Sequence, residues 1–411
     1  MKRLLAPLAA AAGLALASCQ SQPAPVAPNN LADDVKPAAK PAPTDLEQLA
    51  ERLVRQSAGV REGEVVVISS GAENMELLEN IAVQVRKAGA FPLVTVGSDR
   101  LSKRMYADVP EKYDSQTSQL GLKLAELADV MIEVGRPTAE GLFADADPKR
   151  LAARSRAAEP VVEAFIKNGV RTVEVGNGLY PQDWLAGRYS MTPEDLAKTF
   201  WGGVNVDYTD LQSRGAQVSA ALSAGRELHI RHPNGTDLKV RVEGRPYGVS
   251  DGIISAEDVK KGPAGLSVYL PAGEVYVTPV PGTAEGKVVR AVDYYEGLEI
   301  KDLTMTFAAG RLTSLAGSGP GFEKLKAAYD AAGEGKDLFA VVDFGINPNV
   351  KLPSDSKAAT WVPAGTVTVG VGNNVWAGGD NKSAYGYFVS LAGTTVTLDG
   401  KPVVEAGQLK L

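Results

Sequence analysis

The sequence predicts an α/β protein with an N-terminal, doubly wound, mostly parallel sheet domain and a β-rich α+β C-terminal domain. Two observations carry this prediction. From Leu46 to Val175, short apolar strand segments alternate with amphipathic helical segments, which is the pattern of a parallel sheet covered by helices. From Glu227 onward, apolar residues recur mainly with a period of two, and turn residues separate the short segments.

The N-terminal half begins with a helix and continues as strand–helix units. Thr44 or Asp45 is expected to cap the first helix, and Ser190 or Thr192 a later helix that starts at Pro193. No glycine-rich phosphate-binding loop follows the first strand, so no nucleotide site is predicted. The strands are expected at 65–68, 92–96, 130–134 and 172–175, and the intervening helices at about 75–87, 120–127 and 148–167.

The C-terminal half begins with a hairpin around the turn Pro233-Asn234-Gly235. A helix at about 321–332 interrupts the strands that follow. Two domains are therefore expected, at residues 45–215 and 216–411. The strands are expected at 228–231, 238–242, 253–254, 266–270, 274–277, 287–292, 303–307, 341–344, 365–371, 383–390 and 394–398.

The first 44 residues are expected to lie outside both domains. Residues 1–18 have a basic start, an apolar stretch and small residues directly before Cys19, which is the pattern of a lipoprotein signal peptide. Residues 19–44, rich in Pro and Ala, are expected to form a tether. These features predict a lipid anchor at Cys19 in a bacterial cell envelope, and Gln20 favours the outer membrane, facing the periplasm.

The composition of the chain excludes some classes of binding partner and of bonded site. The net charge is -6 and acidic and basic residues are interspersed, so no nucleic-acid surface is expected. Cys19 is the only cysteine, so an internal disulfide is excluded. His229 and His232 are the only histidines, and their odd spacing in a strand sends them to opposite faces, where they cannot bind one metal ion together. Small molecules, peptides or proteins remain as partners.

Two acidic residues stand where strands meet turns. Glu274 follows Pro271-Ala272-Gly273 and precedes a β-branched run, and Asp343 lies in the buried segment 339–344 just before Gly345. Such strand ends commonly carry functional side chains. The two carboxylates are therefore candidates for one shared site.

These two stretches, together with the Gly- and Asn-rich segment 365–390, resemble the metal site of the thermophilic metallo-aminopeptidases of the aminopeptidase T and aminopeptidase S type. The resemblance runs from about Leu46 to the C-terminus. In that family a Pro-x-Gly-Glu pattern supplies a metal-ligating glutamate, which corresponds to Glu274, and a later segment supplies a second acidic ligand, which corresponds to Asp343. The resemblance implies the same two-domain fold and a homodimer.

The resemblance also implies that most of the metal site has been lost. The family's histidine ligand corresponds to Thr368, and its His-x-Asp pair corresponds to Gly386 and Phe388. A two-metal site needs a bridging carboxylate and several terminal ligands, which Glu274 and Asp343 alone do not supply. No cofactor is therefore expected. A single hard cation held by the two acids and by oxygens of Asn373, Asn374 or Asp380 stays open as an alternative.

The sequence thus predicts a lipid-anchored envelope protein with a metallo-aminopeptidase fold that is inactive as a peptidase and binds peptides or envelope proteins. Two alternatives stay open. The first is an active aminopeptidase that holds a divalent metal with substitute ligands such as Glu285 or Asp380. The second is a structural envelope scaffold whose former cleft is filled by Trp376, Tyr385, Tyr387 and Phe388.

Overall fold

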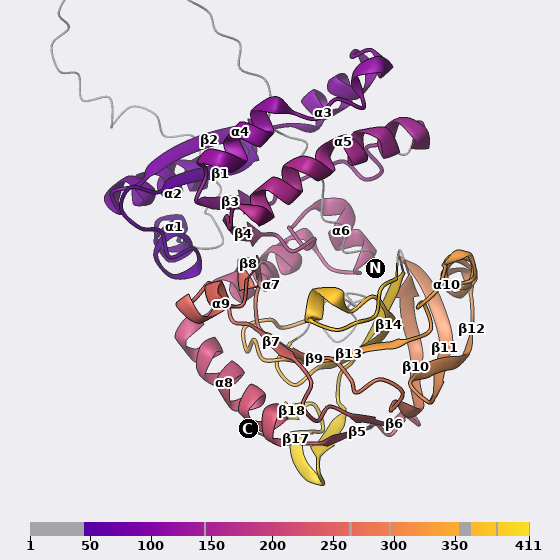
Figure 1. The fold of residues 1–411 in the computed structure, drawn as a ribbon. Coiled ribbons are helices and arrows are strands. Elements are labelled where there is room, and N and C mark those ends of the chain that lie inside the picture. Colours follow the sequence, from indigo (N-terminus) through magenta and orange to yellow (C-terminus); the bar gives the residue numbers. More distant parts are fainter. Residues whose placement is uncertain are drawn as a thin grey trace, which may run out of the picture.

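The computed structural model describes residues 45–143, 145–262, 265–295, 297–352, 363–383 and 385–410, without the side chains of residues 148 and 152. Three sheets make up the fold (Figure 1). None of the helices in these segments is long and apolar enough to cross a membrane. The helices are α1 Leu46–Arg52, α2 Met75–Lys87, α3 Asp99–Ala107, α4 Gln119–Leu127, α5 Pro148–Lys167, α6 Asp183–Arg188, α7 Pro193–Val204, α8 Tyr208–Ala224, α9 Ala256–Lys260 and α10 Pro320–Ala331.

Sheet A is parallel and has the strand order β2-β1-β3-β4-β8. Apolar residues of α1 and α2 pack with Val66 and Ile68 on one face, and those of α4 and α5 pack with Val67 and Met131 on the other. Helices on both faces confirm the predicted doubly wound sheet. The strands are β1 Val65–Gly71, β2 Phe91–Gly97, β3 Val130–Val134, β4 Arg171–Val175 and β8 Ser267–Leu270.

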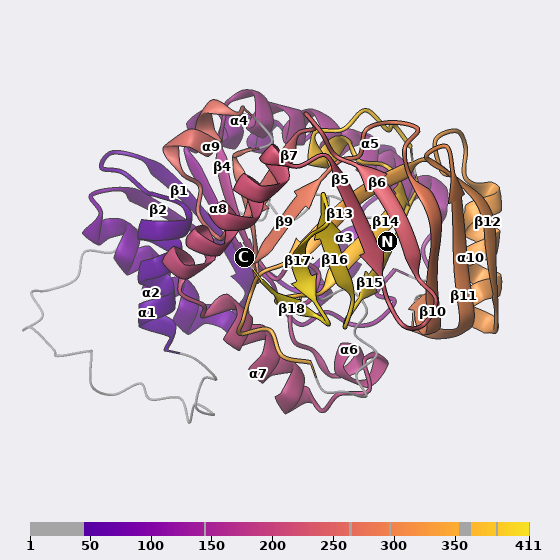
Figure 2. The same cartoon turned by 90° about the horizontal axis from the view of Figure 1, so that it is seen from below.

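Sheet B is antiparallel, with the order β12-β11-β10-β6-β5-β16-β17-β18. It curves around one side of the β-rich half, and α10 lies against β10, β11 and β12 (Figure 2). The strands are β5 Glu227–Arg231, β6 Asp237–Arg241, β10 Glu285–Tyr295, β11 Leu298–Ala308, β12 Arg311–Ser318, β16 Thr395–Leu398, β17 Lys401–Glu405 and β18 Gln408–Leu409.

Sheet C is antiparallel, with the order β15-β14-β13-β9-β7. One of its faces is apolar and joins the main core through residues such as Val275, Phe344 and Val369. The other face carries the candidate site. The strands are β7 Tyr247–Ser250, β9 Glu274–Val277, β13 Phe339–Gly345, β14 Val367–Gly372 and β15 Gly386–Leu391.

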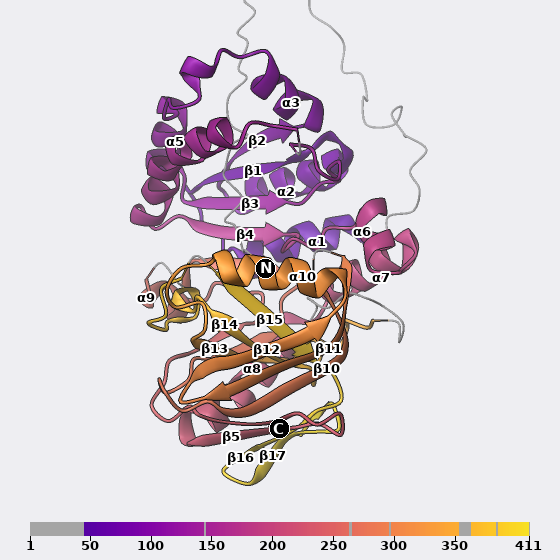
Figure 3. The same cartoon turned by 90° about the vertical axis from the view of Figure 1, so that its right-hand side faces the viewer.

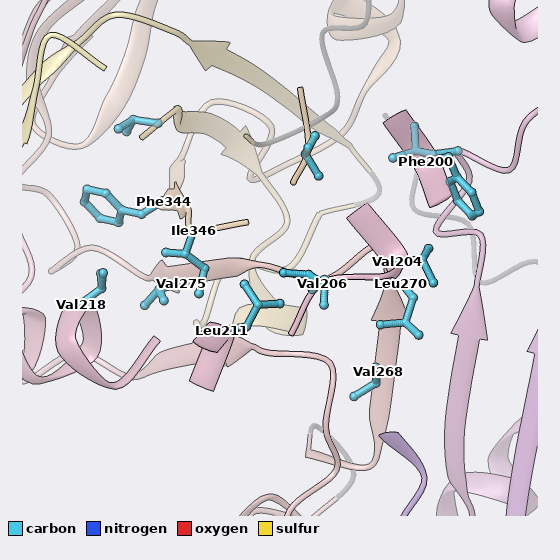
Figure 4. Packing of buried hydrophobic residues seen from close by; sticks show 14 of the residues in the cluster. Phe200, Val204, Val206, Leu211, Val218, Val268, Leu270, Val275, Phe344 and Ile346 are labelled. Atoms are coloured by element: carbon cyan, nitrogen blue, oxygen red, sulfur yellow. The ribbon is translucent and has the colours of Figure 1, made fainter. Parts of the chain in front are cut away.

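The chain crosses between the two halves more than once. The domain boundary expected between residues 215 and 216 falls inside α8. Strand β8 comes after this boundary in the sequence, yet it pairs with β4 in sheet A. Val268 and Leu270 of β8 lie in the same core as Leu211 of α8 and Val275 of β9 (Figure 4). One continuous core therefore connects sheet A to sheet C.

Helix-capping side chains and a turn set the ends of several helices and strands, as predicted from neighbouring residues. The Asp45 side chain accepts a hydrogen bond from the backbone N–H of Gln48, and Thr192 caps α7 through the N–H of Asp195. The predicted 233–235 turn joins β5 to β6. Residues 253–254, expected to form a strand, belong to none, because the chain turns there toward α9. Eight of the helices and strands given above were not predicted: α3, α6, α8, α9, β7, β12, β17 and β18.

Candidate functional site

Glu274 is positioned by the turn that precedes β9. Gly273 has a φ of 128°, and a Cβ there would collide with Asn347, so only glycine fits. Asn347, 1 % exposed, donates its side-chain amide to the carbonyl oxygens of Gly203 (3.0 Å) and Ala272 (2.6 Å). These bonds hold the start of β9 against the end of β13, so Glu274 lies beside Gly345.

Asp343 lies in the middle of sheet C. In the strand register its neighbours are Tyr276 of β9 and Thr368 of β14, and Thr368 in turn lies opposite Ser390 of β15. Residues in register across a sheet point to the same face. Asp343 is 5 % exposed, so its carboxylate sits at the bottom of this row.

Glu274 and Phe388 belong to the same face, because each lies two residues along its strand from a member of the row. Sheet C therefore brings Glu274, Asp343, Thr368, Gly386 and Phe388 onto four adjacent strands and one face, which we call the site face. Cys19, the candidate lipidation residue, lies outside the described residues.

Thr368 and Ser390 bind each other. Their hydroxyl oxygens are 2.8 Å apart, and Thr368 is 7 % exposed. A mutual hydroxyl pair offers neither a charge nor an imidazole nitrogen, which are the ligands that transition metals prefer. This part of the site face therefore carries two neutral hydroxyl groups that are hydrogen-bonded to each other.

The ring of Phe388 covers the positions beside it. A Cβ on Gly370 would collide with this ring, and one on Gly386 would come within 3.1 Å of it. Phe388 also packs against Trp376 with ring centroids 6.2 Å apart, and Trp376 against Tyr276 at 5.2 Å. The three rings are each partly exposed and rest on Ala340, Val341 and Ala377. We call them the aromatic cluster.

The two-metal site of a metallopeptidase does not fit this face. In the described ranges, no group of three or more His, Cys, Asp or Glu residues could hold a metal ion. Glu274 and Asp343 are the acidic side chains of the site face, and the remaining positions of the expected ligand set carry a hydroxyl, a glycine and an aromatic ring.

The other residues weighed as metal ligands, and His229, have different partners in the structure. Glu285 lies on sheet B and accepts a hydrogen bond from the Ala309 N–H (2.6 Å). Asp380 lies 3.4 Å from Arg245 and is mostly exposed. The side-chain oxygens of Asn373 and Asn374 accept hydrogen bonds from N–H groups of their own loop. His229 pairs with Asp237 on sheet B, at 2.7 Å.

The four aromatic residues expected to fill the cleft in the scaffold alternative do not pack in one cluster. Trp376 and Phe388 belong to the aromatic cluster, whereas Tyr385 and Tyr387 are buried in the main core. Successive residues of β15 alternate between faces, which separates Tyr387 from Phe388. Sequence reasoning also missed Tyr276 and Ser390, although each lies two residues along its strand from a candidate position.

The sequence profile of the thermophilic metalloprotease family (M29) matches residues 43–329. AmpT from Thermus thermophilus has a similar structure, with 18% identity, a TM-score of 0.63, and coverage of 89% of this chain and 99% of that chain. A second similar structure is 2,5-dihydroxypyridine dioxygenase from Pseudomonas putida KT2440, with 16% identity, a TM-score of 0.55, and coverage of 89% and 96%.

No curated protein sequence matches the chain. At these identities the two structures bear on the fold, which they share over most of their length. The family profile covers more than half of the chain and includes sheet A, β9 and Glu274. The chain is therefore a member of the thermophilic metalloprotease family (M29).

Proposed function

We propose that this protein is a catalytically inactive member of its family that binds peptides or protein segments on the site face of sheet C. It acts in the bacterial cell envelope, where a lipid on Cys19 anchors it to the outer membrane. The observation that carries this proposal is the composition of the site face, where the aromatic cluster and two carboxylates take the place of a full metal-ligand set.

Peptide hydrolysis in this family's chemistry requires metal ions that polarise the scissile carbonyl and ionise a water. Aspartate at position 343 still offers oxygen ligands, but Thr368 is engaged with Ser390, and the Phe388 ring fills the space above Gly386. An apolar ring beside a candidate metal position disfavours a buried cation. These contacts support loss of the peptidase reaction.

Binding is supported by the same residues. Tyr276, Trp376 and Phe388 are partly exposed, and aromatic side chains of this kind commonly anchor protein interfaces. The carboxylates of Glu274 and Asp343 on the same face favour a ligand with a positive charge, such as the free amino end or a basic side chain of a peptide.

The proposal is tested by measuring metal content, aminopeptidase turnover and peptide binding on the purified protein, with and without zinc, cobalt or manganese. We expect no turnover, and binding of basic peptides that Trp376→Ala weakens about tenfold or more, as loss of an aromatic anchor does. Val375→Ala is the matched control, because Val375 adjoins Trp376 and is 47% exposed. Metal-dependent turnover that Glu274→Ala abolishes would establish the active aminopeptidase instead.

Anchoring is tested separately by fractionating cells that express the wild type or Cys19→Ala. We expect the wild type in the outer-membrane fraction, with a lipid-modified N-terminal peptide in mass spectrometry. The variant should lack the modification. An unmodified wild-type N-terminus would refute the anchor without affecting the proposal for the site face.

A further inference from the structure

The aromatic cluster presents ring surfaces that are inclined to one another. It lies on sheet C, whose strands β13, β14 and β15 lie between sheet A and strands β5, β16 and β17 of sheet B (Figure 3). The ring planes of Tyr276 and Trp376 are at 57° with centroids 5.2 Å apart, and those of Trp376 and Phe388 are at 73°. The indole therefore stands at an angle to both of its neighbours. We call the Tyr276 and Trp376 rings the ring corner.

Both rings of the ring corner are held in place by the sheet and by one loop. A Cβ on Gly248 would collide with the Tyr276 ring, so this ring lies across β7, the last strand of sheet C. The Trp376 indole N–H donates to a carbonyl oxygen of its own loop at 3.1 Å. Asn374, 2 % exposed, ties that loop to β13 by donating its side-chain amide to a carbonyl oxygen there at 2.8 Å. Rings that are already positioned lower the entropic cost of binding a ligand.

The charges beside the ring corner are negative. Asp343 lies in register with Tyr276 on the neighbouring strand, and Glu274 precedes Tyr276 by two residues on the same face. The five strands of sheet C contain no Lys, Arg or His, so these two carboxylates are the charged side chains that the strands supply. The faces of aromatic rings are also electronegative. Carboxylates next to ring faces therefore attract an organic cation.

The groups around the ring corner favour a cation that has no N–H donors. A primary ammonium has three donors, which lose their water in an aromatic site and need acceptors there. The hydroxyls of Thr368 and Ser390 are paired with each other, and ring faces accept hydrogen bonds only weakly. Asp343 is 5 % exposed, so it acts on a ligand above the face mainly through its charge. A quaternary ammonium needs no acceptor, and its methyl groups pack on ring faces.

We propose that the ring corner binds the quaternary ammonium group of a small molecule of the choline type. The trimethylammonium head lies against the rings of Tyr276 and Trp376, and Asp343 and Glu274 supply the opposite charge. This ligand uses the site face assigned above to peptides, so it rests on the proposed function in that respect. Its chemistry differs from that of a peptide amine, because it is recognised without hydrogen bonds to the cation.

The test measures choline binding to the purified full-length protein in dodecyl maltoside by isothermal titration calorimetry. Two probes are compared with choline: its neutral isostere, in which carbon replaces the nitrogen, and ethanolamine, the primary ammonium with the same chain. We expect saturable choline binding that is about tenfold tighter than that of either probe, since only choline has both the charge and the methyl groups. Equal binding of the neutral isostere, or equal binding of ethanolamine, overturns the proposal.

Variants at matched positions locate the bound choline. Tyr276→Leu removes one ring and should weaken binding about tenfold, whereas Tyr276→Phe keeps the ring and should change it less than about threefold. Tyr247→Leu is the control, because Tyr247 is exposed (43%) on β7 and alternation directs it to the other face. If Tyr276→Leu does not fold by circular dichroism, Glu274→Gln decides, since it should weaken choline binding but not that of the neutral isostere.

Peptide binding measured on the same samples separates this ligand from the proposed function. Choline binding that Tyr276→Leu weakens, without any peptide binding, would support the ring corner and refute the proposal for peptides. Binding of basic peptides through Trp376, without choline binding, would overturn the choline-type ligand and leave the proposed function intact. A peptide with trimethyllysine that binds while choline does not would also overturn it and assign the quaternary group to a peptide.

Discussion

At the scale of single residues, the most unusual group outside the site face is Asp293. It is 2 % exposed on β10, accepts a hydrogen bond from the Tyr387 hydroxyl (2.7 Å) and lies 3.7 Å from Arg290. Burial raises the pKa of Asp293 above its ordinary value, although Arg290 and Tyr387 oppose the shift. Burial beside Asp293 also raises the pKa of Tyr387 well above its ordinary value.

A raised folded-state pKa predicts how Asp293 affects stability. The folded protein holds the proton more tightly than the unfolded chain, so Asp293 lowers the free energy of unfolding as pH rises from about 3.9 through its folded pKa. Asp293→Asn keeps an acceptor for Tyr387 but cannot ionise. We expect its stability relative to the wild type to increase across that range, measured by urea unfolding at several pH values.

Asp237→Asn is the control with the opposite sign. The hydrogen bond from His229 lowers the pKa of Asp237, so its contribution to stability is present above about pH 3.9 and is lost as pH falls. The relative stability of Asp237→Asn should therefore decrease as pH rises through the acidic range. If the stability difference between Asp293→Asn and the wild type did not change with pH, Asp293 would not have the raised pKa on which this prediction rests.

At the scale of elements, the site face depends on the junction between α7, the turn before β9 and the end of β13. Asn347 joins these three elements through two donated hydrogen bonds, and its side-chain oxygen accepts a third from the Asn349 N–H (2.9 Å). Loss of a buried donor leaves carbonyl oxygens without a partner, which costs about 1–3 kcal/mol each.

We therefore expect Asn347→Ala to lower the free energy of unfolding by about 2–4 kcal/mol, since two buried carbonyl groups lose their donor. The measurement is chemical denaturation followed by tryptophan fluorescence. Asn349→Ala removes an exposed amide two residues away and should change stability by less than about 0.5 kcal/mol. Equal effects of the two substitutions would show that the junction does not depend on Asn347.

At the scale of the whole molecule, strand β8 makes the two halves interdependent. It contributes the last strand of sheet A, next to β4, although its neighbours in sequence lie in the β-rich half. Val173 and Val175 of β4 are fully buried in this arrangement. Without β8, β4 would become an edge strand and its apolar side chains would be exposed.

A fragment of residues 45–225, which ends before β8, is therefore expected to lack a cooperative unfolding transition and to be digested rapidly by protease. The full chain should unfold in one transition, because its main core is continuous. Circular dichroism during heating and limited proteolysis measure both properties. A fragment that unfolds cooperatively near the transition temperature of the full chain would contradict this interdependence.

The sequence alone determined the features that depend on neighbouring residues. The alternation of strands and helices, the caps at Asp45 and Thr192 and the 233–235 turn follow from local periodicity and turn chemistry. Helix α8 was missed although Tyr208, Leu211 and Leu222 recur at helical spacing, because small and polar residues surround them. The family motifs likewise identified Glu274 and Asp343 as candidates.

Only the tertiary structure decided which distant segments meet. The pairing of β8 with β4, the row from Tyr276 to Ser390 and the packing of Trp376 against Tyr276 arise from contacts between residues far apart in sequence. Local periodicity shows that a strand has two faces, but not which strand it pairs with or what packs on each face. Those choices depend on burial over the whole chain.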